Sequence, residues 1–314
     1  MTTKKSSSAK SSKSSDSKAK LTGSKTKNQV SANPEVIEEV KDLDPIPAEN
    51  QIHAGQDTSQ EPEPIPVVDI LIPFVTQTVK WEELKFALRS IEKFVTTPHR
   101  VIILGSERPE WASEKLLLIK CEQIQGFENA KAFDAVAKLE KAIDSDISTD
   151  FVYTYDDVVF LNHVTLEDLK VRVSHDRLKD ENNIQGFTGS ARWKKVMINT
   201  LLRLKVNKLP DFNYETHLPR VFNKELLKTT FLRFGFKRWP YMVPTIYFNS
   251  NFEGPDVILD ASSPTIEISK PLPYDLMKEL LCSKKILTYN DNGLTEDLKE
   301  ILLEMFPEKS TYEK

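Results

Sequence analysis

The sequence has few cysteines and no long hydrophobic run. Two cysteines in 314 residues, without a CxxC motif or a His/Cys cluster, exclude a disulfide framework and a zinc motif. The apolar runs are shorter than the roughly 20 residues of a membrane helix, and the Lys-containing N-terminus lacks the apolar core of a secretory signal. A net charge of −4 and a pI near 5.9 argue against nucleic-acid binding by the folded part. We therefore expect a soluble, cytoplasmic protein.

The first 64 residues contain almost no aromatic side chains. Residues 1–27 hold eight Lys and one Asp, whereas residues 28–64 hold nine acidic residues and one Lys. Such segments bury too little apolar surface to offset the chain entropy lost on folding. We therefore predict a disordered tail over residues 1–64 with two blocks of opposite charge. It is a solubilising or tethering leader or, alternatively, its basic block contacts nucleic acid, a membrane or a protein partner.

Strand-like and helix-like segments begin to alternate at Val67. VVDILIPFV is typical of a buried strand that ends or bulges at Pro73, and the 3.6-residue period of WEELKFALRSIEKFV predicts an amphipathic helix. In all, the pattern predicts strands over 67–75, 99–105, 115–124 and 151–161, and helices over 81–95 and 128–143. Continuous apolar strands that alternate with helices favour a layered, Rossmann-like α/β domain with a mostly parallel sheet.

The pattern after Asn162 is less regular and mainly helical. Thr165, with Asp168 three residues later, predicts a capped helix start, and Asn223 caps a further predicted helix. Other segments predict a short strand over 183–190 and helices over 193–205, 222–234, 273–281 and 294–306. We divide the chain into the tail (1–64), an α/β catalytic domain (65–250) and a C-terminal helical extension packed on that domain (251–314).

FVYTYDDVVFL, residues 151–161, places Asp156 and Asp157 inside an apolar strand. Ligands of a doubly wound sheet bind outside the carboxyl ends of its strands, where this pair is expected to emerge. Two like charges this close are costly without a cation. Mg²⁺ and Mn²⁺ prefer oxygen ligands and share them with substrate phosphates. The pair predicts such a metal site, unless the acids cap the next turn or pair with surface Lys and Arg.

Two segments resemble known sugar-transferring proteins. FVYTYDDVVFLN resembles the acidic motif of GT-A-type glycosyltransferases, in which a strand ends in an Asp-rich turn. WEELKFALRSIEKFV with VIILGSERPEW, FENAKAFDAV and YDDVVFL resembles the Stealth proteins, which move hexose-1-phosphate from a nucleotide sugar to a sugar hydroxyl, and related phage and bacterial glycosyltransferase-like proteins. The resemblance covers roughly residues 67–235. The chain departs from the Stealth pattern at LIPFVTQTVKWEEL, where those proteins have a strand ending in Trp-Val-Asp-Gly.

The resemblance implies a GT-A-like fold and a bound Mn²⁺ or Mg²⁺. Tyr155 stands where many members have the first acid, so Asp157 is the main predicted metal ligand and Asp156 a second one. Arg89 is a predicted contact to the donor diphosphate, because guanidinium groups match phosphate oxygens; alternatively it is a solvated helix arginine.

A second anion contact is predicted at the start of the helix over 128–143. Asn129 and Lys131 lie at its N-terminus, where backbone N–H groups attract anions, and we expect them on the donor side. Taken by itself, Asn129 is a good N-cap residue.

NYETHLPRVF, residues 213–222, brings Glu215 and His217 two positions apart in an extended-looking segment. Residues so spaced in a strand share one face. His217 is a candidate third metal ligand or general base, since its pKa is ordinarily near neutral, and Stealth proteins have a His-Pro element in a comparable place. A hydrogen-bonded structural histidine is the alternative.

These features predict a metal-dependent transferase that moves a sugar or sugar-1-phosphate from a nucleotide-sugar donor to a glycan or other hydroxyl acceptor. The candidate catalytic residues are His217, Glu215 and Asp156, and the candidate metal ligands are Asp157, Asp156 and His217. The alternative is a non-catalytic protein of the same fold that binds a nucleotide, glycan or protein partner. A nucleotidyltransferase is disfavoured, because the sequence shows no glycine-rich phosphate loop.

Overall fold

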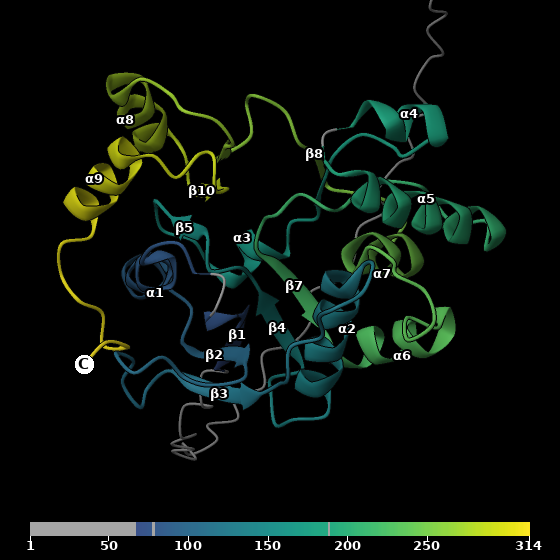
Figure 1. Ribbon diagram of the computed structural model, residues 1–314, viewed down its shortest axis with the longest axis horizontal. Helices are drawn as coiled ribbons and strands as arrows, with labels where there is room; N and C mark the ends of the chain where they lie inside the picture. The colour runs from purple at the N-terminus through teal and green to yellow at the C-terminus, as the bar shows by residue number, and fades with distance from the viewer. Residues whose placement is uncertain (1–66, 77–78, 188) are drawn as a thin grey trace, which may run out of the picture. The chain divides into compact units, whose positions relative to one another are not determined.

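In the computed structural model of the protein, four parallel strands form the centre (Figure 1). The structure describes residues 67–76, 79–187 and 189–314, so the predicted tail lies outside it. The main sheet has the order β3 (Leu117–Lys120), β2 (His99–Gly105), β1 (Val68–Pro73), β4 (Asp150–Tyr153) and β7 (Arg220–Asn223). Only β7 runs antiparallel to its neighbour. The predicted α/β class with a mostly parallel sheet is confirmed.

Helices cover both faces of this sheet, as the alternating strand residues require. Ile70 and Ile72 of β1 pack with α1 on one face, whereas Leu71 faces the other. That other face is covered by apolar residues of α2 and of α5 to α7. The helices are α1 (Glu83–Phe94), α2 (Ala130–Ile143), α3 (Leu166–Lys170), α4 (Glu181–Gly186), α5 (Ala191–Val206), α6 (Lys224–Phe234), α7 (Val243–Asn251), α8 (Tyr274–Ser283) and α9 (Glu296–Met305).

The order of the strands creates a switch point beside β1. The chain runs from β1 through α1 to β2 on one side, and later through α2 to β4 on the other side. Connections that leave adjacent parallel strands in opposite directions open a crevice at the carboxyl ends of those strands. The turn after β4 therefore begins where a ligand site is expected in such a fold.

The predicted strand over 151–161 is two strands in different sheets. β4 ends at Tyr153, and β5 (Val158–Phe160) begins after a turn and pairs antiparallel with β10 (Ile286–Tyr289). The turn carries Asp156 and Asp157, so these acids do not interrupt a strand. The short strand predicted over 183–190 is also wrong: residues 181–186 form α4, which Asp180 caps at the Asn183 amide.

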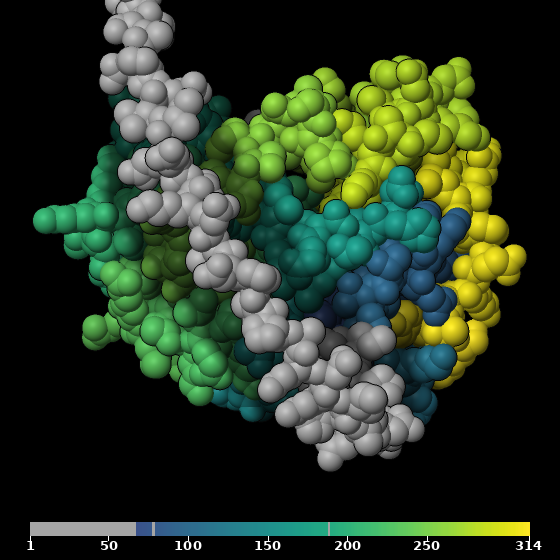
Figure 2. All heavy atoms as spheres, turned by 180° about the vertical axis from the view of Figure 1, so that it is seen from behind, coloured from purple at the N-terminus to yellow at the C-terminus, as the bar shows by residue number. Residues whose placement is uncertain are grey.

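The C-terminal segment is not only helical, in contrast to the prediction. Besides α8 and α9, it contributes β8 (Val257–Ile258), β9 (Thr265–Ile268) and β10. β8 pairs with β6 (Val173–Ser174), and β10 lies between β5 and β9. An apolar cluster joins α8 and α9 to Phe86 and Val159 from earlier parts of the chain. Figure 2 shows this yellow C-terminal part beside blue residues from the beginning of the described chain.

The capping predictions at both helix starts are confirmed. Thr165 and Asp168 form a capping box at the start of α3, and the Asn223 side chain accepts hydrogen bonds at the start of α6. In the described part of the chain, none of the helices has the length and hydropathy to cross a membrane.

Candidate active site

The acidic turn after β4 brings an aspartate into contact with a histidine. Asp157 Oδ1 lies 2.8 Å from His217 Nε2, and the ring of His217 stacks on Tyr155 with centroids 4.2 Å apart. Burial lowers the pKa of His217, but the hydrogen bond and the charge of Asp157 outweigh that effect and leave the pKa raised. The two side chains form an ion pair when His217 is protonated. Both residues were candidates from the sequence, and the structure brings them together.

Asp156 lies beside this pair in a poorly solvated position. Burial, followed by the charge of Asp157, raises the pKa of Asp156 to about 7. Its carboxyl group therefore resists ionisation in the free protein at neutral pH. A cation near the turn would reverse that preference.

His217 belongs to a tight loop rather than to the predicted extended segment. Its φ of 52° lies in the left-handed region, which costs most residues other than glycine on the order of 1 kcal/mol. The Thr216 amide donates to the Tyr214 carbonyl, and β7 begins only at Arg220. The prediction that Glu215 and His217 share one face of a strand is therefore wrong. Both nevertheless line the same cavity, because the left-handed residue turns the chain.

Arg220 holds this loop from the first position of β7. Its buried guanidinium donates to the carbonyls of Leu218 (3.1 Å) and Tyr214 (3.1 Å). Arg220 thus fixes both ends of the short segment that carries Glu215 and His217. Arg220 was not predicted from the sequence, although it is a charged side chain in the otherwise apolar run after Pro219.

A cavity of about 960 Å³ adjoins the Asp157–His217 pair, which is large enough for a drug-sized ligand or a cofactor. Helices α2, α5 and the start of α7 supply most of its apolar wall, and the turn after β4, the 213–217 loop, β9 and the end of β10 supply polar groups. The polar lining residues include Lys131, Asp157, His175, Asp176, Asn213, Glu215, Thr216, His217, Glu267, Thr288, Tyr289 and Asn290.

The cavity holds more carboxylates than cations. Among the described residues, Asp157, Asp176, Glu215 and Glu267 line it together with one lysine, Lys131. Lys131 comes from the first turn of α2, and its side chain makes no hydrogen bond or ion pair with the other residues that the structure describes. It is therefore an available cation at the predicted donor side.

Glu215 carries an unusual buried oxygen. Its Oε2 atom has no hydrogen-bond partner in the described structure, and burial raises the pKa of the carboxyl group. A desolvated carboxylate with a raised pKa is a stronger base near neutral pH than a solvated one. Glu215 thus has the environment expected of a general base.

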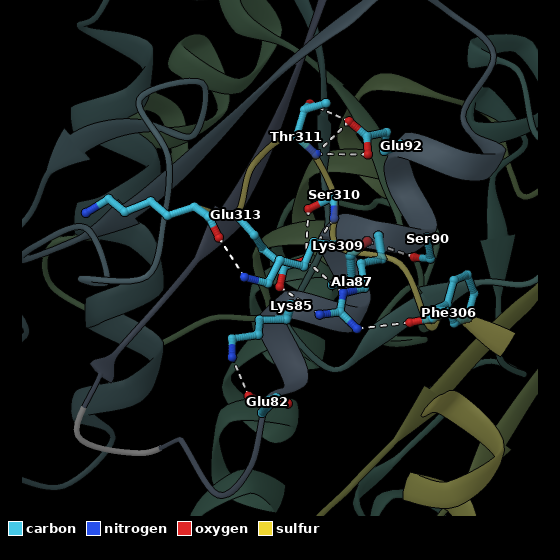
Figure 3. A network of polar contacts seen from close by, with 12 residues as sticks. Glu82, Lys85, Ala87, Ser90, Glu92, Phe306, Lys309, Ser310, Thr311 and Glu313 are labelled. Atoms are coloured by element: carbon cyan, nitrogen blue, oxygen red, sulfur yellow. Dashed lines mark hydrogen bonds and ion pairs between the residues drawn. The ribbon is translucent and has the colours of Figure 1, made fainter. Parts of the chain in front are cut away.

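Arg89 does not reach this cavity, which corrects its predicted role. Its guanidinium forms two hydrogen bonds with the Glu313 carboxylate, at 2.7 and 2.8 Å, and a third with the Phe306 carbonyl. Figure 3 shows Glu313 and Phe306 in this network, which joins α1 to the C-terminal segment. The side chains of Arg89 and Glu313 are only 10% and 4% exposed. Arg89 therefore has a structural ion-pair partner and no open face for a diphosphate.

Asn129 also differs from the prediction. It precedes α2 with a left-handed φ of 63° and makes no side-chain cap hydrogen bond. It does not line the cavity, unlike Lys131 two residues later. Of the three predicted donor contacts, the structure brings only Lys131 to the cavity.

The predicted metal ligands are only partly assembled. Asp157 and His217 are in contact, but Asp156 does not line the cavity. Among the residues that the structure describes, no three His, Cys, Asp or Glu side chains are arranged to hold a metal ion, so the predicted three-ligand set is not assembled there and stays a prediction. Mg²⁺ often binds one or two carboxylates and takes its other ligands from phosphate and water. Asp157 and His217 alone therefore suit a metal ion that enters together with an anionic ligand better than one that stays bound to the free protein.

Several lining residues were not predicted from the sequence, because they come from distant parts of the chain. His175 follows β6, Glu267 lies in β9, and Tyr289 and Asn290 lie at the end of β10. Burial lowers the pKa of His175, which keeps its ring neutral. The pairing of β10 with β5 brings Tyr289 and Asn290 to the acidic turn. No local sequence pattern predicts that pairing.

The fold is similar to several solved glycosyltransferases. The bifunctional glycosyltransferase WbbM shares 13% identity over 79% of this chain, with a TM-score of 0.45, and the match spans 51% of the WbbM chain. The galactosyltransferase LgtC, solved with donor and acceptor sugar analogs, shares 12% identity over 78% of this chain and 97% of its own, with a TM-score of 0.42.

GlyE of Streptococcus pneumoniae is a third such structure, with 14% identity over 77% of this chain and 61% of its own and a TM-score of 0.41. No family model and no curated protein matches the sequence. TM-scores below 0.5 are too low to assign a family or an activity, so any function has to be argued from the cavity itself.

Proposed function

We propose that the cavity binds a nucleotide-sugar donor and that the protein transfers its sugar to a hydroxyl acceptor. The observation that carries this proposal is the Asp157–His217 pair, which lies at the carboxyl end of β4 on the wall of a cavity of about 960 Å³. Both residues, together with Glu215 and Lys131, combine a base, cations and a carboxylate in one place. Transfer of a sugar from a nucleoside diphosphate requires a base for the acceptor and positive charge for the leaving group.

Each side chain has a distinct role in the proposed reaction. The bond between the anomeric carbon and the diphosphate oxygen breaks, and its electron pair leaves with the nucleoside diphosphate. The acceptor oxygen forms a new bond to that carbon and gives its proton to Glu215. Lys131 and protonated His217 stabilise the negative charge on the leaving group. Asp157 keeps His217 protonated and oriented through their hydrogen bond.

A divalent ion fits this proposal if it binds together with the diphosphate of the donor. With such an ion bound, Asp157 and a deprotonated His217 would hold it against the diphosphate, and the ion would take the place of the charge that protonated His217 supplies without it; Asp156 would add negative charge nearby. When bound, such an ion stabilises charge on the departing oxygen. The acid-rich lining supports this proposal, since without a cation these carboxylates repel a diphosphate.

The finer features of the proposed enzyme rest on the sequence resemblance. A Stealth-like enzyme of the GT-A type would instead let the acceptor oxygen attack the phosphorus next to the sugar, so that hexose-1-phosphate is transferred and a nucleoside monophosphate leaves. A cytoplasmic location also stays a prediction.

A binding protein without transferase activity is the second candidate. Arg89 is engaged elsewhere and the three-ligand metal set is not assembled, and both observations favour a protein that retains the cavity without the chemistry. Such a protein would bind a nucleotide or glycan and release no product.

Calorimetric titration tests the proposed donor site. Wild-type protein is titrated with UDP-, GDP-, CDP- and dTDP-sugars, with and without Mn²⁺. Asp157→Ala is measured beside the control Asp146→Ala, which changes an exposed acid that does not line the cavity. We expect one class of donor to bind, more tightly with Mn²⁺, and Asp157→Ala to lose roughly 10-fold or more in affinity. Absence of binding by every donor would exclude the proposal.

A further inference from the structure

Tyr289 is a buried tyrosine of the cavity wall whose hydroxyl has no hydrogen-bond partner among the described residues. Its side chain is only 2% exposed, yet the residue lines the cavity at the end of β10. The hydroxyl oxygen has no partner in the part of the chain that the structure describes. Buried polar groups are nearly always paired, and an unpaired hydroxyl costs about 1–3 kcal/mol. A partner from the adjoining cavity would satisfy it.

The surroundings of Tyr289 restrict the chemistry of that partner. Glu83, Asp157 and Asp156 are close enough to act on the phenol electrostatically, and burial raises the pKa of Tyr289 well above its usual range. The phenol therefore keeps its proton and can donate it. Without a cation between them, these neighbouring acids disfavour an anionic group such as phosphate within reach of the phenol, whereas a neutral group with hydroxyls can accept from the phenol and donate to the acids.

Glu215 supplies a second unpaired oxygen among the lining residues. Its Oε2 has no partner in the part of the chain that the structure describes, and Glu215 acts electrostatically on His217. The cavity thus has a hydroxyl donor near Asp157 and a carboxylate acceptor near His217. A hydrogen-bond donor and an acceptor in the lining of one cavity match a ligand that carries several hydroxyls.

We propose that Tyr289 donates a hydrogen bond to an oxygen of a bound sugar ring, so that β10 forms part of the sugar-binding site. This proposal rests on the proposed function, and it adds the segment that sequence reasoning assigned to a helical extension. The ring belongs either to the donor or to the acceptor. Donor and acceptor sugars both offer ring hydroxyls to Tyr289, and their binding can be measured separately.

Tyr289→Phe is the variant that tests this role, because it removes only the hydroxyl and keeps the ring in its apolar cluster. Tyr312→Phe is the matched control: Tyr312 is also a buried tyrosine of the C-terminal segment, but it does not line the cavity. The free protein should keep its melting temperature in Tyr289→Phe or gain slightly, since an unpaired buried hydroxyl is removed. A clear loss of stability would mean that the hydroxyl has a partner within the protein and would overturn the proposal.

Three sets of titrations then locate the contact. The first uses UDP-glucose, UDP-galactose, UDP-N-acetylglucosamine and GDP-mannose with Mn²⁺; the second uses UDP and GDP alone; the third uses the free sugars in the presence of UDP or GDP. For Tyr289→Phe we expect roughly 3- to 10-fold weaker binding in the first or the third set. Weakening in the first set assigns the ring to the donor, and weakening in the third assigns it to the acceptor. UDP and GDP should bind as tightly as to wild type.

The remaining outcomes separate this proposal from the proposed function. If wild-type protein binds the nucleotide sugars and Tyr289→Phe binds them and the free sugars equally well, the role of Tyr289 is wrong and the donor site stands. If UDP and GDP weaken as much as their sugars, Tyr289 contacts the nucleotide and the sugar assignment is wrong. If wild-type protein binds no member of any set, both proposals fall.

Discussion

Asp156 destabilises the folded protein when its carboxyl group is ionised. Its pKa of about 7 in the folded protein lies above the ordinary value of 3.8, so the folded state binds its proton more tightly than the unfolded state does. The contribution of this group to stability therefore falls as pH rises from about 4 to about 7. The penalty persists above pH 7, where a cation would relieve it.

Asp156→Asn should therefore stabilise the ligand-free protein at pH 8 and have little effect at pH 4.5. The full shift corresponds to roughly 4 kcal/mol, and solvent screening at this half-buried position reduces the expected gain to about 1–2 kcal/mol. Urea unfolding at the two pH values measures it. Asp146→Asn, at an exposed acid, is the control. An equal effect of Asp156→Asn at both pH values would contradict the assigned pKa.

A second prediction at the residue scale concerns Tyr214 and Arg220. The Tyr214 hydroxyl and Arg220 Nη2 are both buried without a partner in the described structure, and both residues line a small cavity of about 10 Å³. That volume is close to the minimum that holds one water molecule. A crystal structure at high resolution should show a single ordered water bound to both atoms. An empty cavity would contradict this expectation.

At the scale of elements, the pair Arg89–Glu313 connects α1 to the C-terminal segment. Because both side chains are almost fully buried, removing one partner leaves an uncompensated charge, which typically costs about 3–5 kcal/mol. Arg89→Met should lower the free energy of unfolding by roughly 3 kcal/mol and leave nucleotide-sugar affinity unchanged. Urea unfolding and calorimetry measure the two effects.

Lys85→Met is the control for this variant, since Lys85 pairs with Glu82 at a more exposed position of the same helix. Exposed pairs contribute about 0–1 kcal/mol, so this change should have little effect on stability. If Arg89→Met weakened ligand binding while the stability stayed the same, the diphosphate contact predicted from the sequence would be right after all.

Element prediction from the sequence succeeded where the signal is local. The apolar period of α1, the continuous apolar run of β2 and the capping box of α3 are properties of neighbouring residues. Pairing between distant segments leaves no such signal. The two-strand nature of residues 151–161 depends on β10, more than 120 residues later, and the turn at His217 depends on hydrogen bonds from Arg220.

The contrast between local signals and long-range contacts also explains which residues of the candidate site were predicted from the sequence. Asp157, Glu215, His217 and Lys131 were chosen from local chemistry, and all four line the cavity. Arg89 was chosen from a motif in its helix, but its partner Glu313 lies 224 residues away. Tyr289 and His175 were missed, since nothing near them in the sequence marks them as cavity residues.

At the scale of the whole molecule, the C-terminal segment both completes the core and closes the cavity. Phe86 and Val159 are fully buried against Met277, Leu287 and their neighbours. A protein truncated after Gly254 would expose these side chains and lose Tyr289. Burial of each large side chain contributes about 1.5–3 kcal/mol, so we expect the truncated protein to lose cooperative thermal unfolding. Calorimetry that shows an unchanged transition would contradict this dependence.

The central claim is that the cavity transfers a sugar from a nucleotide donor, and product release tests it most directly. Purified protein is incubated with Mn²⁺ and each nucleotide sugar, and the freed nucleoside diphosphate or monophosphate is quantified by chromatography. We expect release from one class of donor by the wild-type protein and a loss of roughly 100-fold or more in Asp157→Ala. Asp146→Ala should retain full activity. Release that is the same in wild type and Asp157→Ala, or no release from any donor by the wild type even with acceptor sugars added, would contradict the claim.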